Sequence, residues 1–142
     1  MSTADPLPAE YTARARARLG TLEAPQLVAV AVSPDGDEAR ALTRRFVTMY
    51  LGGQPHIAAE LGLDPELVER LTSLIGTWPP PPGAVEEAES LVGPEIVDRL
   101  AVAGTAAECR ERIGAWTDAG ASYPLVVPLT ENVAEIAEAL RP

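Results

Sequence analysis

Few residues in this sequence have side chains suited to covalent chemistry, and the two most reactive types occur once each. His56 is the single histidine and Cys109 the single cysteine, which excludes a pair of imidazoles, a cysteine-based zinc site and an intrachain disulfide. Glycine-rich phosphate loops and the GxSxG, HExxH and CxxC motifs are also absent. We expect His56 to lie at the surface beside Pro55, and Cys109 to pack in the apolar stripe of a helix. The motifs therefore assign no catalytic, cofactor-binding or metal-binding residue.

Three further features have ordinary structural explanations. Glu86, Glu87 and Glu89 could hold a cation, but a solvated helix face explains them better. Residues 79–82 are four consecutive prolines and satisfy the PxxP pattern of SH3 ligands. No arginine flanks them, so an extended linker is favoured. We expect Trp78, which precedes the prolines, to pack as a lid over apolar neighbours.

Charge and composition limit the classes of partner. The 142 residues carry 11 basic and 21 acidic side chains, a net charge of −10. Such a surface repels phosphate backbones and anionic lipids, so we expect neither nucleic acid nor a membrane as a partner. The longest apolar run, residues 27–32, is far shorter than the roughly 20 residues of a membrane helix. No signal peptide is visible, and we expect a cytoplasmic protein.

Two short apolar segments predict the strands. Residues 26–33 form a valine-rich run between turn residues, which is typical of a strand buried on both faces in a parallel sheet. Residues 123–129 (YPLVVPL) predict a second such strand. Pro124 and Pro128 lack backbone N–H groups, so this strand is expected to pair mainly at its first residue or through one side.

The remaining segments predict helices. A helical insertion is expected over 37–102, and a helix over 105–119 that Thr105 and Glu108 open with a capping box. A C-terminal helix is expected over 131–140, and a first helix ends at Gly20. Strands joined through helices must be parallel, with a right-handed crossover. The sequence therefore predicts one α/β domain over 1–142, rich in helix, with two parallel strands.

The candidate site follows from this topology. In parallel α/β folds, ligands bind beyond the carboxyl ends of the strands. Ser33 and Asp35 follow the first predicted strand, and Thr130 follows the second. These three residues are the candidates for the mouth of a pocket. Asp35 and Thr130 are also natural helix N-caps, which explains their positions without a ligand.

The segment 92–128 resembles the C-terminal end of the luciferase-like flavin or deazaflavin oxidoreductases. It reads VGPEIVDRLAVAGTAAECRERIGAWTDAGASYPLVVP. The matching positions are Gly104-Thr105, Glu108-Cys109, Asp118-Ala119-Gly120 and Pro128. Upstream, VAVAVSPDGDEARALTRRFVTMYLG and IAAELGLDPELVERL resemble the family's penultimate barrel strand and the helical insertion that follows it. The likeness is greatest to the branch that contains methylenetetrahydromethanopterin reductase.

The resemblance implies the last part of a (β/α)8 barrel: helix 6, strand 7, the insertion, helix 7, strand 8 and helix 8. It also implies hydride transfer or monooxygenation with F420 or FMN, without a metal. A whole barrel takes roughly 250 residues, so the chain would not be catalytic alone. The family's cofactor-binding residues come mostly from earlier strands and loops of the barrel. None of them has a counterpart in this sequence. Self-association or a second chain would complete the barrel. The alternative is a non-catalytic α/β interaction module or the remnant of a truncated gene.

Overall fold

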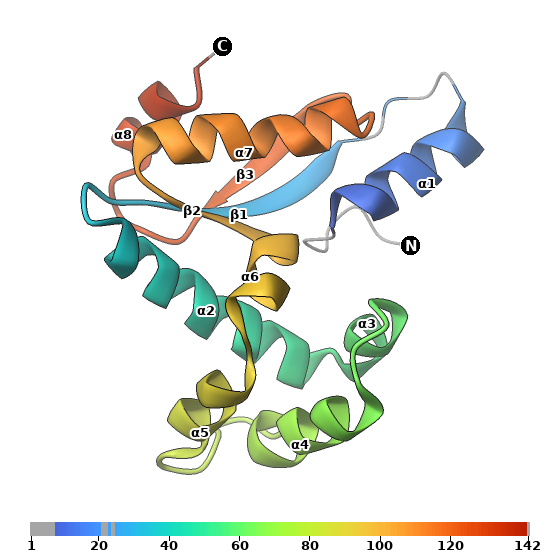
Figure 1. The fold of residues 1–142 in the computed structure, drawn as a ribbon, viewed down its shortest axis with the longest axis vertical. Coiled ribbons are helices and arrows are strands. Elements are labelled where there is room, and N and C mark those ends of the chain that lie inside the picture. The colour runs from blue at the N-terminus through green and yellow to red at the C-terminus, as the bar shows by residue number, and fades with distance from the viewer. Residues whose placement is uncertain (1–7, 21–22, 24, 142) are drawn as a thin grey trace. The chain divides into compact units, whose positions relative to one another are not determined.

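A computed structural model of the chain describes residues 8–20, 23 and 25–141 (Figure 1). None of the helices in these ranges is long and apolar enough to cross a membrane. The elements, in chain order, are α1 (Ala9–Leu19), β1 (Gln26–Val32), α2 (Gly36–Gly53), α3 (Pro55–Glu60), α4 (Pro65–Ile75), α5 (Ala84–Leu91), α6 (Pro94–Leu100), β2 (Ala101–Gly104), α7 (Ala106–Asp118), β3 (Pro124–Pro128) and α8 (Val133–Ala139).

The chain forms two compact units. The first contains the described residues of Met1–Thr43 and of Asp98–Pro142, and the second is Arg44–Val97. The first unit holds a parallel sheet with the strand order β2-β1-β3. The predicted α/β class with parallel strands is confirmed, and the strand expected over 26–33 is β1, the centre of the sheet.

The prediction of only two strands is wrong. A helix was expected to continue through residue 102, but α6 ends at Leu100 and the four residues of β2 follow directly. Ala101 pairs with Ala29 of β1, and the pairing runs on to Gly104 opposite Val32. Every residue of β2 is buried. The pairing with β1 thus overrides the helix propensity of alanine, a tertiary effect that no local pattern reveals.

Opposite faces of the sheet pack against different helices. The valines of β1, such as Val28 and Val30, pack with Cys109, Ile113 and Trp116 of α7. On the other face, Ala31 of β1 and Ala103 of β2 pack with Ala39 in the first turns of α2. The Cys109 thiol is fully buried and donates a hydrogen bond to the Ala31 carbonyl, 3.5 Å away. Burial raises the pKa of this thiol, so Cys109 is a packing residue, as predicted.

The outer edge of β3 is poor in hydrogen-bond donors. The Tyr123 carbonyl accepts from the Gln26 N–H at 3.2 Å, and the Leu129 N–H donates to the Val30 carbonyl at 2.8 Å. The odd-numbered residues of this segment therefore face β1, and the even-numbered residues face away from it. Two of those even positions are Pro124 and Pro128, which have no N–H. The strand pairs through one side, as predicted, and its other side is unsuited to adding a strand.

A capping box opens α7, as the sequence predicts. The Glu108 carboxylate accepts from the Thr105 N–H at 2.7 Å, and the Thr105 hydroxyl accepts from the Glu108 N–H. Gly104 precedes the box with φ of 145°, and a Cβ at this position would overlap the Glu108 carboxylate. Glycine is therefore required where β2 turns into α7.

The second unit is helical. It contains α3, α4 and α5, and its most buried side chains include Leu71 and Ile75 of α4 and Ala88 of α5. An ion pair of 2.5 Å joins Arg70 of α4 to Glu87 of α5. His56, in α3, is exposed, as predicted. The insertion predicted over 37–102 is helical in character up to Leu100, and prolines at the first positions of α3 and α4 account for where these two helices begin.

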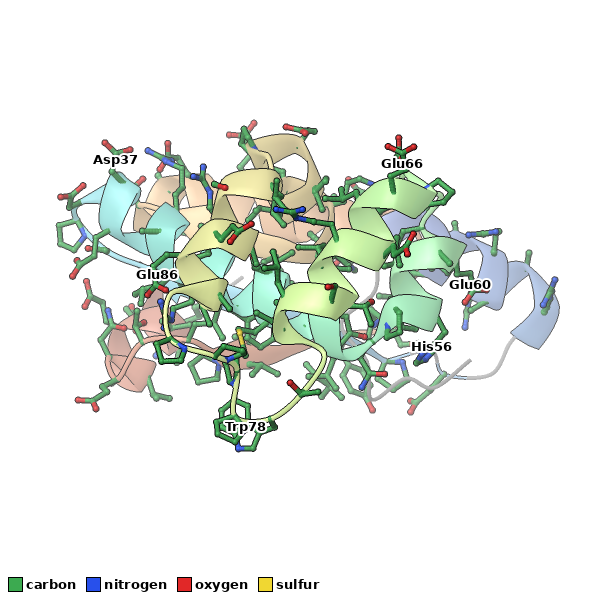
Figure 2. The ribbon with its side chains drawn as sticks, turned by 90° about the horizontal axis from the view of Figure 1, so that it is seen from below. Asp37, His56, Glu60, Glu66, Trp78 and Glu86 are labelled. Carbon is green, nitrogen blue, oxygen red and sulfur yellow. The ribbon has the colours of Figure 1, made fainter. Side chains whose placement is uncertain are left out.

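The loop between α4 and α5 corrects two expectations. Trp78 projects from this loop (Figure 2) and is 84% exposed, so the expectation that it packs as a lid is wrong. The expectation of a linker at residues 79–82 also needs correction, because this segment joins two helices of one unit that are paired through Arg70 and Glu87.

Candidate functional site

The carboxyl ends of β1 and β3 border a shallow hollow of about 290 Å³. Parallel strands end at the same side of a sheet, so the loops after them meet there. Ser33 and Thr130, two of the three residues predicted from the sequence, both line this hollow. The third, Asp35, does not line it. Its carboxylate caps α2 instead, accepting from the Asp37 N–H at 3.0 Å.

The Ser33 hydroxyl is hydrogen-bonded to two neighbouring residues. It donates to the Glu38 carboxylate at 2.8 Å and accepts from the Asp35 N–H at 3.2 Å. The side chain is 7% exposed. No imidazole lines the hollow, and the Ser33 hydroxyl takes part in the start of α2 through both of these hydrogen bonds. The geometry makes Ser33 a residue that shapes the mouth of the hollow.

Asn132, like Glu38 and Glu131, lines this hollow but was not among the residues predicted from the sequence. Its side-chain amide donates to the Val32 carbonyl at 3.1 Å and to the Glu135 carboxylate at 2.8 Å. The Thr130 hydroxyl is hydrogen-bonded to the Asn132 amide oxygen. Asn132 thus fastens the start of α8 to the end of β1. An asparagine just before a helix was the available signal.

These contacts also correct the predicted start of the last helix. Thr130 was expected to cap a helix over 131–140, but α8 runs over Val133–Ala139 with Asn132 at the N-cap position. The hydrogen bonds of Thr130 and Asn132 hold the backbone between them outside the helix. Local side-chain bonding of this kind competes with helix formation.

The hollow has an acidic lining. Glu38 and Glu131 contribute carboxylates, and no arginine is among its lining residues. Arg40, on the same helix as Glu38, pairs instead with Asp37 at 3.2 Å and Glu108 at 3.8 Å. Across the part of the chain that the structure describes, no three His, Cys, Asp or Glu side chains are grouped to hold a metal ion. The hollow therefore suits neutral or cationic hydrogen-bond donors and disfavours a phosphate group.

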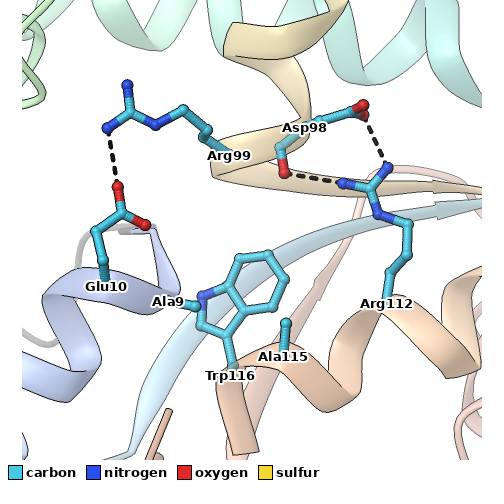
Figure 3. Close-up of a pocket in the computed structure, with 7 residues that line it drawn as sticks. All are labelled: Ala9, Glu10, Asp98, Arg99, Arg112, Ala115 and Trp116. Atoms are coloured by element: carbon cyan, nitrogen blue, oxygen red, sulfur yellow. Dashed lines mark hydrogen bonds and ion pairs between the residues drawn. The ribbon is translucent and has the colours of Figure 1, made fainter. Parts of the chain in front are cut away.

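A second hollow, of about 270 Å³, lies between α1, α6 and α7 (Figure 3). Arg99 of α6 pairs with Glu10 of α1, and Arg112 of α7 pairs with Asp98, each at 2.8 Å. Trp116 lines the hollow but is only 3% exposed. Both guanidinium groups are neutralised within the protein, and the indole face is covered. The two ion pairs beside this hollow join α1 to α6 and α6 to α7. We call this pair of contacts the clasp.

The clasp predicts a pH dependence of stability. Partial burial acts to raise the pKa of Glu10, but the hydrogen bond and charge of Arg99 outweigh it and lower the pKa overall. The ionised Glu10 carboxylate therefore adds to the free energy of unfolding at pH values above its unfolded pKa of about 4.3. This contribution is lost as the pH falls through the lower pKa of the folded state. Glu10→Gln should lower the free energy of unfolding by at most about 1 kcal/mol at pH 7, because the pair is largely exposed.

Urea unfolding of both proteins at neutral and acid pH measures this difference, which should shrink as the pH falls and the Glu10 carboxylate takes up a proton. Glu111→Gln is the matched control, since Glu111 is exposed on α7. A difference for Glu10→Gln that persists undiminished at acid pH would refute the role given to the carboxylate.

The fold and the site define a parallel α/β protein with a hollow at the carboxyl ends of its strands. Residues 6–123 match the family model described as luciferase-like monooxygenase. The chain belongs to the luciferase-like monooxygenase family, which confirms the resemblance found in its sequence. No curated protein matches the chain.

A solved structure has a similar fold. It is the coenzyme F420 dependent tetrahydromethanopterin reductase from Methanopyrus kandleri, with a TM-score of 0.74 and 19% sequence identity. The match covers 94% of this chain and 42% of the reductase chain. The chain thus spans less than half the length of that protein, and at this identity the likeness concerns the fold.

Proposed function

We propose that the chain is the C-terminal part of a luciferase-like oxidoreductase barrel. In this assignment β1 is strand 7, β3 is strand 8, and α7 and α8 are helices 7 and 8. The chemistry of the whole assembly is hydride transfer or monooxygenation with F420 or FMN. The family match over residues 6–123 and the fold match to 42% of an F420-dependent reductase support this assignment.

The chain does not hold the cofactor alone. F420 and FMN both carry phosphate, and the hollow at the strand ends presents Glu38 and Glu131 without an arginine. The hydroxyl of Ser33 and the amide of Asn132 are already hydrogen-bonded within the chain. The observation that carries the proposal is that this hollow is acidic and that the side chains of Ser33 and Asn132 are already hydrogen-bonded within the chain. The chain supplies one wall of a site whose cofactor-gripping residues come from other segments, and we derive no catalytic step from it.

Barrel completion requires strands at the sheet edges, supplied by a second chain or by self-association. The outer side of β3 offers such a strand the N–H of Val126 but none at positions 124 and 128. On the other side of β1, β2 already occupies the edge from Ala29 to Val32. A completing strand therefore pairs with β3 through few hydrogen bonds and depends on side-chain packing.

A non-catalytic α/β interaction module, or a gene remnant, is the second candidate, and the strand order favours it. In a closed barrel, strands that follow one another in the chain are neighbours, and the helices all lie outside. Here β1 lies between β2 and β3. The start of α2 packs on the sheet face opposite α7. Helices on both faces are typical of a doubly wound unit.

Co-expression separates the two candidates. The chain, carrying an affinity tag, is produced together with the product of the reading frame upstream of its own. The barrel proposal expects a complex of defined mass that binds F420 or FMN. Purification of the chain as a monomer, without a partner and without bound cofactor, would contradict the proposal and favour the module.

A further inference from the structure

The outer side of β3 offers more hydrogen-bond acceptors than donors. The even-numbered residues of this strand face away from β1, so the carbonyls of Pro124, Val126 and Pro128 point outward. Only Val126 adds an N–H group, because proline has none. In the described ranges of the chain, none of the backbone hydrogen bonds outside helices and strands ends on these three carbonyls. The edge therefore suits a partner that brings donors and needs few acceptors.

An apolar hollow of about 320 Å³ lies beside this edge, between β3 and α8. Its lining side chains are all apolar and include Leu125 of β3 and Val133 and Ile136 of α8. Leu125 is 43% exposed and Val133 is 55% exposed. Covering them removes apolar surface from water, so this β3–α8 hollow favours an apolar group on the partner.

Carboxylates gather just beyond the end of β3. Pro128 lines the β3–α8 hollow, and Thr130 lines the acidic hollow at the strand ends. Two residues span at most about 7 Å, so the two hollows come close together at this point. Glu38 and Glu131 line the acidic hollow, and neither forms an ion pair with an arginine in the described part of the chain.

The arginines that contact α8 do not neutralise these carboxylates. Arg110 of α7 donates to the Ala139 carbonyl, and Arg141 pairs with Glu138, each at 2.8 Å. Both contacts lie at the other end of α8 from Glu131. The chain as a whole carries a net charge of −10, and its field attracts cations to this edge. Charge and hydrogen bonding thus both favour a positively charged partner that is rich in donors.

We propose that an extended basic segment of a partner protein lies along the outer side of β3, with an apolar side chain in the β3–α8 hollow and an arginine at Glu131. Arginine fits because it has five N–H donors and no acceptor, so it bonds to carbonyls and carboxylates alike. Its stem also packs on apolar surface. The apolar residue and the arginine are about two positions apart, since an extended chain advances ~3.3 Å per residue. The inference goes beyond the proposed function, because it needs neither a cofactor nor a closed barrel.

A labelled peptide tests the contact with the full chain. The probe has the core Arg-Leu-Arg-Leu-Arg, and its fluorescence anisotropy is followed as the chain is added. We expect saturable binding that weakens as the salt concentration rises from about 0.05 to 0.5 M, because salt screens exposed charges. Two matched peptides should bind at least about tenfold more weakly. Glu-Leu-Glu-Leu-Glu reverses the charge, and Arg-Ser-Arg-Ser-Arg removes the apolar side chains.

Variants of the chain locate the site. Glu131→Arg reverses the charge beyond β3, and Leu125→Ser removes an apolar wall of the hollow. Each should weaken binding of the probe at least about fivefold. Glu69→Arg is the control for charge, because Glu69 is exposed in the second unit and the change alters the net charge equally. Leu42→Ser, at a side chain that is 39% exposed on α2, is the control for the apolar change. Circular dichroism checks that all four variants are folded.

Hydrogen exchange should show added protection over residues 124–133 when the probe is bound. No saturable binding, or equally tight binding of the acidic peptide, would overturn the proposal. Equal losses in Glu131→Arg and Glu69→Arg would also overturn it, because the attraction would then be to the net charge alone. Spermidine is positively charged but has no apolar side chain and should compete poorly. Competition as strong as that of the unlabelled peptide would make a small cation the occupant and overturn the proposal. No cofactor is present in these measurements, so their failure is distinct from failure of the proposed function.

Discussion

Replacing Trp116 by alanine should lower the free energy of unfolding by about 3–5 kcal/mol, the usual range for deleting a buried aromatic side chain. Trp116 is 3% exposed and packs in the cluster that joins the valines of β1 to α7 and α8. The truncation leaves a large cavity between the sheet and the helix that covers it. Because small domains are stable by only about 5–15 kcal/mol, much of the stability of the first unit should be lost.

Urea unfolding followed by far-ultraviolet circular dichroism measures this loss. Trp78→Ala is the matched control, since it deletes the same side chain from a position that is 84% exposed. The control should change the free energy of unfolding by less than about 0.5 kcal/mol. Equal effects of the two changes would show that the α7 face of the sheet is not packed as described.

Replacing Leu71 by alanine should have the second largest effect, a loss of about 2–5 kcal/mol. Leu71 lies in α4 and is fully buried within the second unit. The close approach of α2 and α4 in this unit leaves little room to relax, because a Cβ added at Gly52 would overlap the Ile75 side chain. The cavity should therefore persist after the truncation.

Leu91→Ala is the control for this change, because Leu91 belongs to the same unit and is 37% exposed. Hydrogen exchange should show the greatest loss of protection in α4 and α5 for Leu71→Ala and a small change for the control. Protection lost first in β1 and α7 would contradict the division into two units.

Local signals predicted most of the fold. The valine run of β1, the capping box of Thr105 and Glu108, and the prolines that open α3 and α4 each act within a few residues. They identified both strands that were expected and the type of each helix. The third strand was missed because Ala101, Val102 and Ala103 carry no local strand signal and become extended only through pairing with β1. Strand order likewise depends on contacts between distant residues.

The candidate site was predicted only in part, because some of its contacts also join residues that are distant in the sequence. Topology placed Ser33 and Thr130 at the carboxyl ends of the strands, and the structure brings both into one hollow. Asn132 escaped because its role depends on the Val32 carbonyl, a hundred positions away in sequence. Trp78 was misjudged because nothing in its immediate sequence tells whether a tryptophan beside prolines has apolar neighbours in space.

The central claim is that the chain belongs to the luciferase-like family but does not bind a phosphate-bearing cofactor by itself. Fluorescence titration of the purified chain with F420, and separately with FMN, tests it most directly, with the Methanopyrus kandleri reductase as the positive control for F420. We predict no saturable change with either cofactor, while circular dichroism and a cooperative urea transition show that the chain is folded. Saturable binding of either cofactor at micromolar concentration by the monomeric chain would contradict the claim.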